Sequence, residues 1–179
     1  MIGISMYSQL FEKAFKILID LEGGYVDDPN DRGGKTKYGI TTYTYNNWYL
    51  DLVGREKDEG WPVRVKDITL EQAKEIYWKQ YWIEPEICTL QDELAIHVFV
   101  AGVNMGPPKA IACLQKALQV ARTNEIDDRT YTAQALKPLG ETIVLLNWFL
   151  DEYYRNLAQF PRYGKGWIRR LHTTLREAR

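Results

Sequence analysis

The chain has 179 residues, which is enough for one average domain or for two small lobes that share a core. Its residues are 45% hydrophobic and 26% charged, as in ordinary globular proteins, and this balance excludes disorder over most of the chain. The net charge of −1 creates no overall field for an anionic partner, so we expect no nucleic acid to bind. The 6 Trp, 12 Tyr and 5 Phe predict large core side chains or a surface that stacks on sugars.

The N-terminal residues do not resemble a secretion signal. The first ten lack a basic start, and Glu12 and Lys13 interrupt the apolar run that follows. The longest apolar stretch, 94–103, is too short to span a bilayer. We therefore expect the protein to be made in the cytoplasm, and to act elsewhere only after something releases it.

The residues that hold metals or act as nucleophiles are few. Cys88 and Cys113 lie far apart in the sequence, which favours buried free thiols over a disulfide framework. His97 and His172 stand in no metal-binding motif, and His97 lies in an apolar stretch that predicts a core position. We expect no metal and no cofactor.

Apolar residues recur at three- and four-residue spacing along most of the chain, and this spacing predicts a series of amphipathic helices. The expected helices are 8–22, 42–53, 69–81, 91–104, one that starts at 107, 129–136 and 140–160. Thr69 and Gln72 have the spacing of a capping box. Gly106 precedes two prolines, a pattern that ends one helix and starts the next.

The segment 25–43 differs from the rest because it is rich in Asp, Gly, Pro and Thr. Tyr38 with Ile40 and Thr36 with Thr42 alternate as in short strands, and Asp28-Pro29 and Gly33-Gly34 are turn signals, so a small hairpin or sheet is expected there. The fold class that follows is mainly α, with a small β hairpin or sheet near the N-terminus and two lobes.

Residues 162–179 carry six Lys or Arg and one Glu, a local net charge of +5. Two interpretations are open for this basic tail. It forms a solvated helix face, or it contacts an anionic wall polymer or a membrane surface.

Two carboxylates in contrasting settings stand out near the N-terminus. Glu22 ends an apolar helix beside Gly23 and Gly24, where partial desolvation raises a carboxyl pKa. Asp31 lies nine residues later in a polar turn, and Thr36 follows with a hydroxyl group. Such a pair suits glycoside hydrolysis, in which one carboxyl group donates a proton and the other stays charged. By spacing alone the pattern is weak, since the glycines also fit plain turns.

Longer motifs add a resemblance to a known family. Residues 22–25 read Glu-Gly-Gly-Tyr, and 28–40 read Asp-Pro-x-Asp-x-Gly-Gly-x-Thr-x-Tyr-Gly-Ile. Together they resemble the signature of glycoside hydrolase family 108, lysozyme-like N-acetylmuramidases of which some were once described as secretion activators. Further similarity comes from Tyr-Trp-x-x-Tyr-Trp at 77–82, Val-Asn-Met-Gly at 103–106, and Gly-Trp-x-x-Arg at 166–170.

The resemblance implies a lysozyme-like fold with a catalytic lobe at 8–90. It also implies a helical C-terminal lobe at 91–179, a predicted peptidoglycan-binding module, and we expect the two to form one compact unit. The loop 124–130 departs from the family pattern because it contains neither glycine nor proline.

The resemblance also assigns roles to the carboxylates. Glu22 matches the catalytic glutamate and is expected to be the general acid. The spacing of Glu22, Asp31 and Thr36 is similar to the Glu-Asp-Thr triad of phage lysozymes, in which the threonine comes one residue later. By that analogy Asp31 and Thr36 position the attacking water.

Sugar recognition is expected from Tyr25, Tyr38 and Asn104, because tyrosine stacks on sugar faces and hydrogen-bonds to hydroxyl groups. Core or turn positions remain open for both tyrosines, and a helix C-cap remains open for Asn104. The aromatic residues of the 77–82 motif are expected to pack between lobes rather than to form a sugar platform.

The predicted function is hydrolysis of the β-1,4 bond between N-acetylmuramic acid and N-acetylglucosamine in peptidoglycan, by a monomeric enzyme acting as a phage or prophage endolysin. Two alternatives stay open. A lytic transglycosylase needs only the glutamate, and a non-catalytic peptidoglycan-binding or assembly protein needs no proton donor at all.

Overall fold

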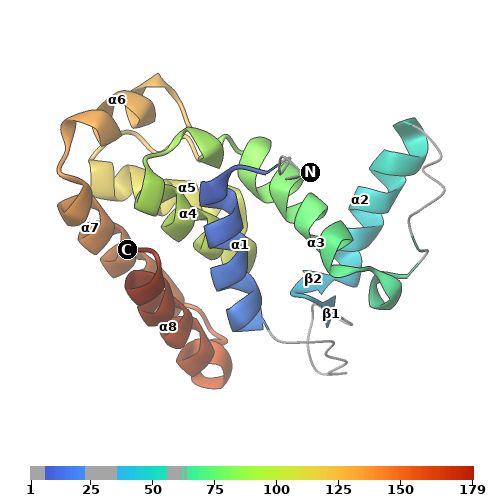
Figure 1. Ribbon diagram of the computed structural model, residues 1–179. Coiled ribbons are helices and arrows are strands. Elements are labelled where there is room, and N and C mark those ends of the chain that lie inside the picture. Colours follow the sequence, from blue (N-terminus) through green and yellow to red (C-terminus); the bar gives the residue numbers. More distant parts are fainter. Residues whose placement is uncertain (1–6, 23–35, 56–61, 63) are drawn as a thin grey trace. The chain divides into compact units, whose positions relative to one another are not determined.

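The computed structural model describes residues 7–22, 36–55, 62 and 64–179 (Figure 1). The described part is mainly helical and has one antiparallel sheet of two short strands. Contacts divide the chain into two compact units, Met1–Ile17 with Trp78–Arg179 and Leu18–Tyr77. We call these the large unit and the hairpin unit. They describe packing, whereas the expected division into functional lobes at 8–90 and 91–179 stays a prediction.

The predicted helix 8–22 is α1 (Gln9–Glu22). The hydroxyl oxygen of Ser8 accepts a hydrogen bond from the backbone N–H of Phe11 at 3.2 Å, which satisfies one of the free donors at the helix start. The apolar face is buried through Phe11, Ala14 and Leu18, as the spacing predicted.

The hairpin unit contains the small sheet and two helices. Strands β1 (Thr36–Lys37) and β2 (Ile40–Thr41) pair antiparallel, with Lys37 opposite Ile40. Helix α2 (Thr42–Arg55) follows directly, and a short 3₁₀ turn η1 (Val65–Asp67) precedes α3 (Leu70–Ile76). The unit buries the following apolar side chains: Leu18, Ile40, Tyr45, Trp48, Val65, Ile68, Ala73, Ile76 and Tyr77.

The capping box at the start of α3 is present in both halves. The side chain of Thr69 accepts from the N–H of Gln72 at 3.2 Å, and that of Gln72 accepts from the N–H of Thr69 at 2.9 Å. The chain stays helical through residue 81 as predicted, but after Ile76 the helix is π-helical, η2 (Tyr77–Ile83).

An aromatic cluster in the large unit surrounds Phe11. The rings of Trp78 and Trp82, both in η2, lie 4.8 and 5.5 Å from that of Phe11, and Phe99 lies 5.8 Å away. Tyr77 and Trp82 are buried. Burial of these two residues of the 77–82 motif fits core packing better than a sugar platform.

Helices α4 (Asp92–Met105), α5 (Pro107–Leu118), α6 (Asp128–Leu136), α7 (Leu139–Arg155) and α8 (Phe160–Glu177) make up most of the large unit, after the 3₁₀ turn η3 (Ile87–Thr89). The middle of α4 is buried continuously and packs against α5, α7 and α8. Gly106, with φ of 87°, separates α4 from α5, and Pro107 starts α5 as predicted.

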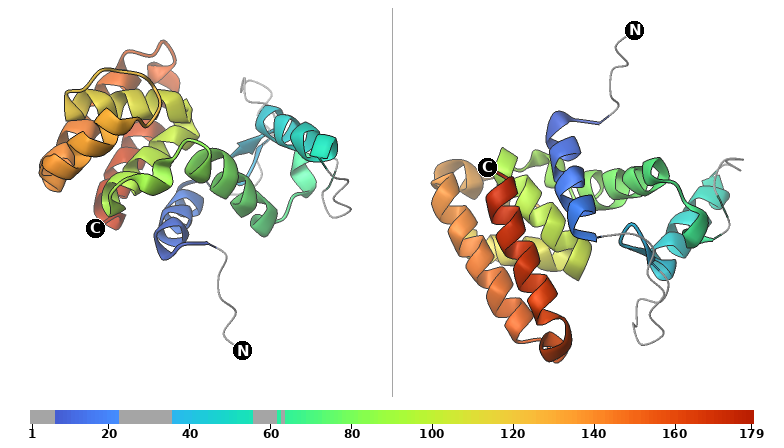
Figure 2. Two further views of the ribbon diagram at one scale, coloured as in Figure 1. Left: turned by 90° about the horizontal axis from the view of Figure 1, so that it is seen from above. Right: turned by 60° about the horizontal axis from the view of Figure 1, so that its bottom comes forward.

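The helix predicted for 140–160 is α7, which ends at Arg155, five residues earlier than predicted, and a further helix that was not predicted, α8, begins at Phe160. The backbone N–H of Asn156 bonds to the carbonyl of Glu152, and Pro161 lies in the first turn of α8. The two helices run antiparallel side by side (Figure 2). At the far end of α8, the Lys13 ammonium donates to the carbonyl oxygens of Ala178 and Arg179 at 2.6 and 2.7 Å.

The thiols and the core histidine can be checked directly. Cys88 and Cys113 are both free, but only Cys113 is buried, so the prediction of a buried thiol is wrong for Cys88. His97 is in the core as predicted, and its Nδ1 lies 3.2 Å from the amide nitrogen of Asn147. Burial lowers the pKa of His97 to about 4.

No helix in the described part of the chain combines the length and apolar character needed to cross a membrane.

Candidate functional site

The structure places three of the predicted site residues in the hairpin unit. Glu22 is the last residue of α1, Thr36 starts β1, and Tyr38 stands in the turn between the strands. Thr36 and Tyr38 are both partly exposed. Tyr25 and Asp31 lie outside the described residues.

The turn between β1 and β2 has an uncommon backbone. Since Lys37 pairs with Ile40, only Tyr38 and Gly39 form the loop, and their φ angles are +53° and +80°. Two positive φ angles are typical of a type I′ turn, whose twist matches that of a two-residue hairpin. Glycine adopts this region freely, whereas a tyrosine is strained there by roughly 1–2 kcal/mol. Other interactions must therefore hold Tyr38 in place.

Two neighbours supply those interactions. The hydroxyl of Tyr77, a residue only 1% exposed, donates to the backbone carbonyl of Tyr38 at 3.0 Å. The Lys37 ammonium lies 5.4 Å from the centre of the Tyr38 ring and donates to the carbonyl of Lys66 at 2.9 Å. The first contact fixes the backbone of the turn, and the second restrains the ring. Tyr38 is therefore presented at the surface of the unit in a defined pose.

Sequence reasoning assigned Tyr77 to packing and missed its contact with the hairpin. The available signal was chemical, because a tyrosine in a core position needs a partner for its hydroxyl group, whereas a phenylalanine does not. The partner itself cannot be read from the sequence, since Tyr38 is 39 residues away.

Asn104 belongs to the large unit, near the end of α4. The C-cap of that helix is Gly106, so the C-cap interpretation of Asn104 is wrong. Its side chain lies close to the hydroxyl group of Tyr154, which is almost fully buried and has no hydrogen-bond partner in the described part of the chain. Burial raises the pKa of Tyr154 to about 12, and the contact with Asn104 opposes this shift.

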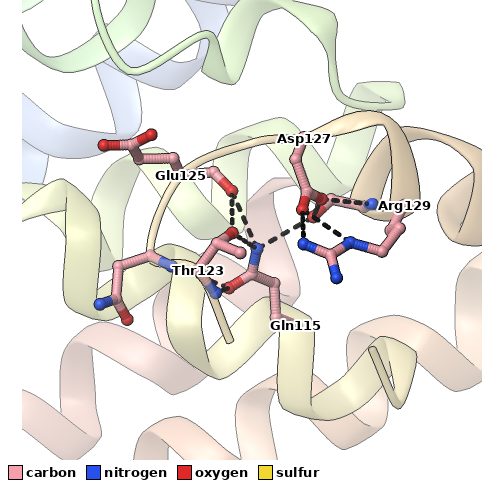
Figure 3. A network of polar contacts seen from close by, with 7 residues as sticks. Gln115, Thr123, Glu125, Asp127 and Arg129 are labelled. Carbon is pink, nitrogen blue, oxygen red and sulfur yellow. Dashed lines mark hydrogen bonds and ion pairs between the residues drawn. The ribbon is translucent and has the colours of Figure 1, made fainter. Parts of the chain in front are cut away.

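The loop that departs from the family pattern is held by a polar network (Figure 3). The amide nitrogen of Gln115, which is fully buried on α5, lies 2.8 Å from the Thr123 hydroxyl, 2.8 Å from the Glu125 carbonyl and 3.0 Å from the Thr130 hydroxyl. Its amide oxygen accepts from the N–H groups of Thr123 and Asn124. This segment therefore completes the packing of the large unit without glycine or proline.

Asp127 joins the same network as the N-cap of α6. Its carboxylate accepts from the N–H and the hydroxyl of Thr130 at 2.9 and 2.7 Å, and it pairs with Arg129. These hydrogen bonds lower the pKa of Asp127 to about 2. Among the residues that the structure describes, no group of three or more His, Cys, Asp or Glu side chains is placed to hold a metal ion.

The described fold is mainly helical and lysozyme-like, with its small sheet directly after the first helix. The model of the family Glycosyl hydrolase 108 matches residues 15–106. The solved structure described as "Structure of Brucella abortus SagA" is similar over 93% of this chain and 92% of that one, with 30% identity and a TM-score of 0.80. Comparison with curated proteins gave no match. The chain belongs to the glycosyl hydrolase 108 family.

Proposed function

We propose that this protein is a peptidoglycan hydrolase of the N-acetylmuramidase type, with Glu22 as its general acid. Family membership supports hydrolysis of a glycosidic bond. The observation that carries the proposal is the position of Glu22 at the end of α1, in the same compact unit as the hairpin that bears Thr36 and Tyr38. The proposed substrate bond joins N-acetylmuramic acid to N-acetylglucosamine.

The end of a helix suits a carboxyl group that must keep its proton. Partial negative charge from the unpaired carbonyls at a helix C-terminus disfavours a carboxylate there. The last turn of α1 contains no basic residue that would offset this effect. Glu22 then protonates the leaving sugar oxygen, because an alkoxide leaves poorly. A positioned general acid of this kind contributes roughly 10²–10⁴-fold to the rate.

The second half of the mechanism uses Asp31 as the base for an attacking water, with Thr36 holding that water. This arrangement inverts the anomeric centre. Analysis of the first product anomer tests it, and net retention would refute the role given to the water. Tyr25, Tyr38 and Asn104 are proposed to bind the sugars.

The decisive experiment is digestion of purified peptidoglycan by the wild type, Glu22→Gln and Glu12→Gln, with mass spectrometry of the released fragments. Glu22→Gln keeps the shape of the side chain and removes the acidic proton. Glu12→Gln makes the same chemical change elsewhere on α1 and serves as the matched control. We expect reducing muramic-acid ends from the wild type and the control, and a loss of at least about 10² in rate for Glu22→Gln.

Other outcomes would replace the proposal. Anhydro-muramic ends would assign the protein to the lytic transglycosylases. Sedimentation with peptidoglycan, without cleavage by any of the three proteins, would indicate a non-catalytic binding or assembly protein. Equal activity of Glu22→Gln and Glu12→Gln would remove Glu22 from the mechanism.

We propose as a second role that of a phage or prophage endolysin, in which the enzyme is made in the cytoplasm and reaches its substrate in the periplasm after release. Expression with and without a membrane-permeabilising holin tests this role. We expect lysis only when both proteins are present, and lysis without the holin would refute the dependence on release.

A further inference from the structure

The large unit has a surface groove of about 620 Å³ formed by the end of α7 and one face of α8. Five basic side chains line it: Arg155, Lys165, Arg169, His172 and Arg176. The four from α8 are spaced by four, three and four residues, which places them on one side of the helix. At a rise of 1.5 Å per residue, this row extends over roughly 16 Å.

The floor of the groove is apolar and shaped by one glycine. Phe160 and Ile168 both line it and are half-buried. A Cβ atom at Gly164 would lie 2.6 Å from the Phe160 ring, so the ring rests on the helix only because position 164 has no side chain. The Arg155 guanidinium lies 5.5 Å from the centre of the same ring.

The charges at the two ends of the groove are already neutralised. Arg155 pairs with Asp151 at 2.6 Å, and Arg176 pairs with Glu177 at 2.8 Å. Lys165 and Arg169, between these ends, are exposed and have no ion-pair partner among the described residues. The middle of the groove therefore offers two uncompensated cations above an apolar floor.

This charge pattern does not serve the stability of α8. The first turn of the helix contains no acidic residue, although acidic residues are favoured there. Lys165 and Arg169 are four residues apart, where like charges repel each other on a helix surface. A merely solvated helix face would gain by mixing its charges, so the arrangement favours an anionic ligand.

The apolar floor and the surrounding surface distinguish between kinds of anionic ligand. A lipid surface is bound by large exposed apolar side chains that insert between lipids, and none of the large hydrophobic residues found exposed in the described chain lies on α8. A bare polyphosphate has no apolar group that could pack against the floor formed by Phe160 and Ile168. A short acidic peptide matches both the cations and the apolar floor of the groove, because its carboxylates bind the cations and its small side chains cover the floor.

We propose that the groove along α8 binds the acidic stem peptides of peptidoglycan, with their carboxylates on Lys165 and Arg169 and their small apolar side chains against Phe160 and Ile168. The proposal rests on the proposed function, which makes peptidoglycan the substrate. It adds a second point of attachment that recognises the peptide rather than the sugar chain. Such a contact keeps the enzyme on wall material that still carries its peptides.

The test measures sedimentation of the full chain with purified sacculi at low temperature. The charge-reversal variant is K165E/R169E. The matched control is K109E/R122E, which makes the same change in charge at two exposed positions of the large unit outside the groove. A third variant, Gly164→Ala, displaces the Phe160 ring and leaves every charge in place. Circular dichroism and thermal unfolding verify that the variants are folded.

We expect K165E/R169E to bind sacculi about tenfold more weakly than the control variant. This is the loss expected when two exposed ion pairs with the ligand are replaced by repulsion between like charges. Gly164→Ala weakens it by a smaller factor. Sacculi stripped of stem peptides by an amidase, or with amidated carboxylates, should bind the wild type as weakly as native sacculi bind K165E/R169E. Equal binding by K165E/R169E and its control would overturn the proposal. Tighter binding to vesicles of phosphatidylglycerol than to sacculi would also overturn it, in favour of a lipid ligand.

The result is separable from the proposed hydrolysis. Groove-dependent binding without cleavage would uphold the groove and refute the enzyme. Cleavage of peptidoglycan that is equally efficient on native and peptide-free glycan chains, with no dependence on Lys165 and Arg169, would uphold the enzyme and refute the groove.

Discussion

Replacement of Tyr77 by phenylalanine separates the stability of the hairpin unit from the presentation of Tyr38. The substitution removes only the hydroxyl group that donates to the Tyr38 carbonyl at 3.0 Å. A hydrogen bond of this kind contributes about 0.5–1.5 kcal/mol. The strain of Tyr38 at φ +53° is of similar size, roughly 1–2 kcal/mol. Because the two terms nearly balance, loss of the bond lets the turn leave its native conformation.

If removal of this hydrogen bond lowers the stability of the turn by about 1 kcal/mol, changes in the unfolding midpoint and in KM can be predicted. The unfolding midpoint of Tyr77→Phe should fall by roughly 2–4 °C. The fraction of molecules with Tyr38 correctly placed should fall by up to about fivefold, so KM for a soluble peptidoglycan fragment should rise by up to that factor. The value of kcat should change less, since the proposed acid Glu22 is untouched.

The hairpin unit supplies a matched control in Tyr45. This residue is also fully buried, and its hydroxyl also donates to a backbone carbonyl, that of Pro62. Tyr45→Phe should lower the unfolding midpoint by a similar amount and leave KM unchanged. The same KM in both variants would refute the reasoning, because Tyr77 would then have only a structural role.

Two further predictions concern the core of the large unit. Burial lowers the pKa of His97 from 6.5 to about 4, so the unfolded chain takes up a proton at a higher pH than the folded one. The contribution of His97 to the free energy of unfolding should therefore be constant above about pH 6.5 and should fall by up to roughly 1.4 kcal/mol per pH unit from there towards pH 4. Urea titrations at a series of pH values measure this dependence. An identical slope in His97→Gln would show that His97 does not cause it. Gln115→Met should lower the free energy of unfolding by roughly 2–4 kcal/mol and speed amide exchange at Thr123, because several buried polar groups lose their partner. Gln159→Met, at an exposed position, should cost less than about 0.5 kcal/mol, and a similar cost for both variants would show that the network is dispensable.

Features set by neighbours in the sequence could be predicted without the structure. The helix 8–22, the capping box of Thr69 and Gln72 and the change of helix at Gly106 all agree with the structure. A small hairpin was also predicted and is present, but Tyr38, which was expected in a strand, lies in its turn. Helix periodicity, caps and turn glycines act over a few residues, and their energies depend little on the rest of the chain. The same local pattern placed Glu22 at the end of its helix, as observed.

The sequence names candidate site residues, and these stay predictions, but it gives no arrangement for them. The sequence named Thr36 and Tyr38, and only the fold showed that Tyr77 holds the turn in which Tyr38 is strained. The exposure of Cys88 and the place of Asn104 beside Tyr154 likewise required the structure. Each of these facts depends on a partner that lies far away along the chain.

The basic tail shows where local patterns stop and packing decides. The sequence alone shows that residues 162–179 are strongly basic. It did not determine that the chain ends α7 at Arg155 and turns back as α8, nor that Phe160 lies on Gly164 to form the floor of a groove. Charge and periodicity are properties of neighbouring residues. A groove exists only after two helices have packed and left one face without a partner.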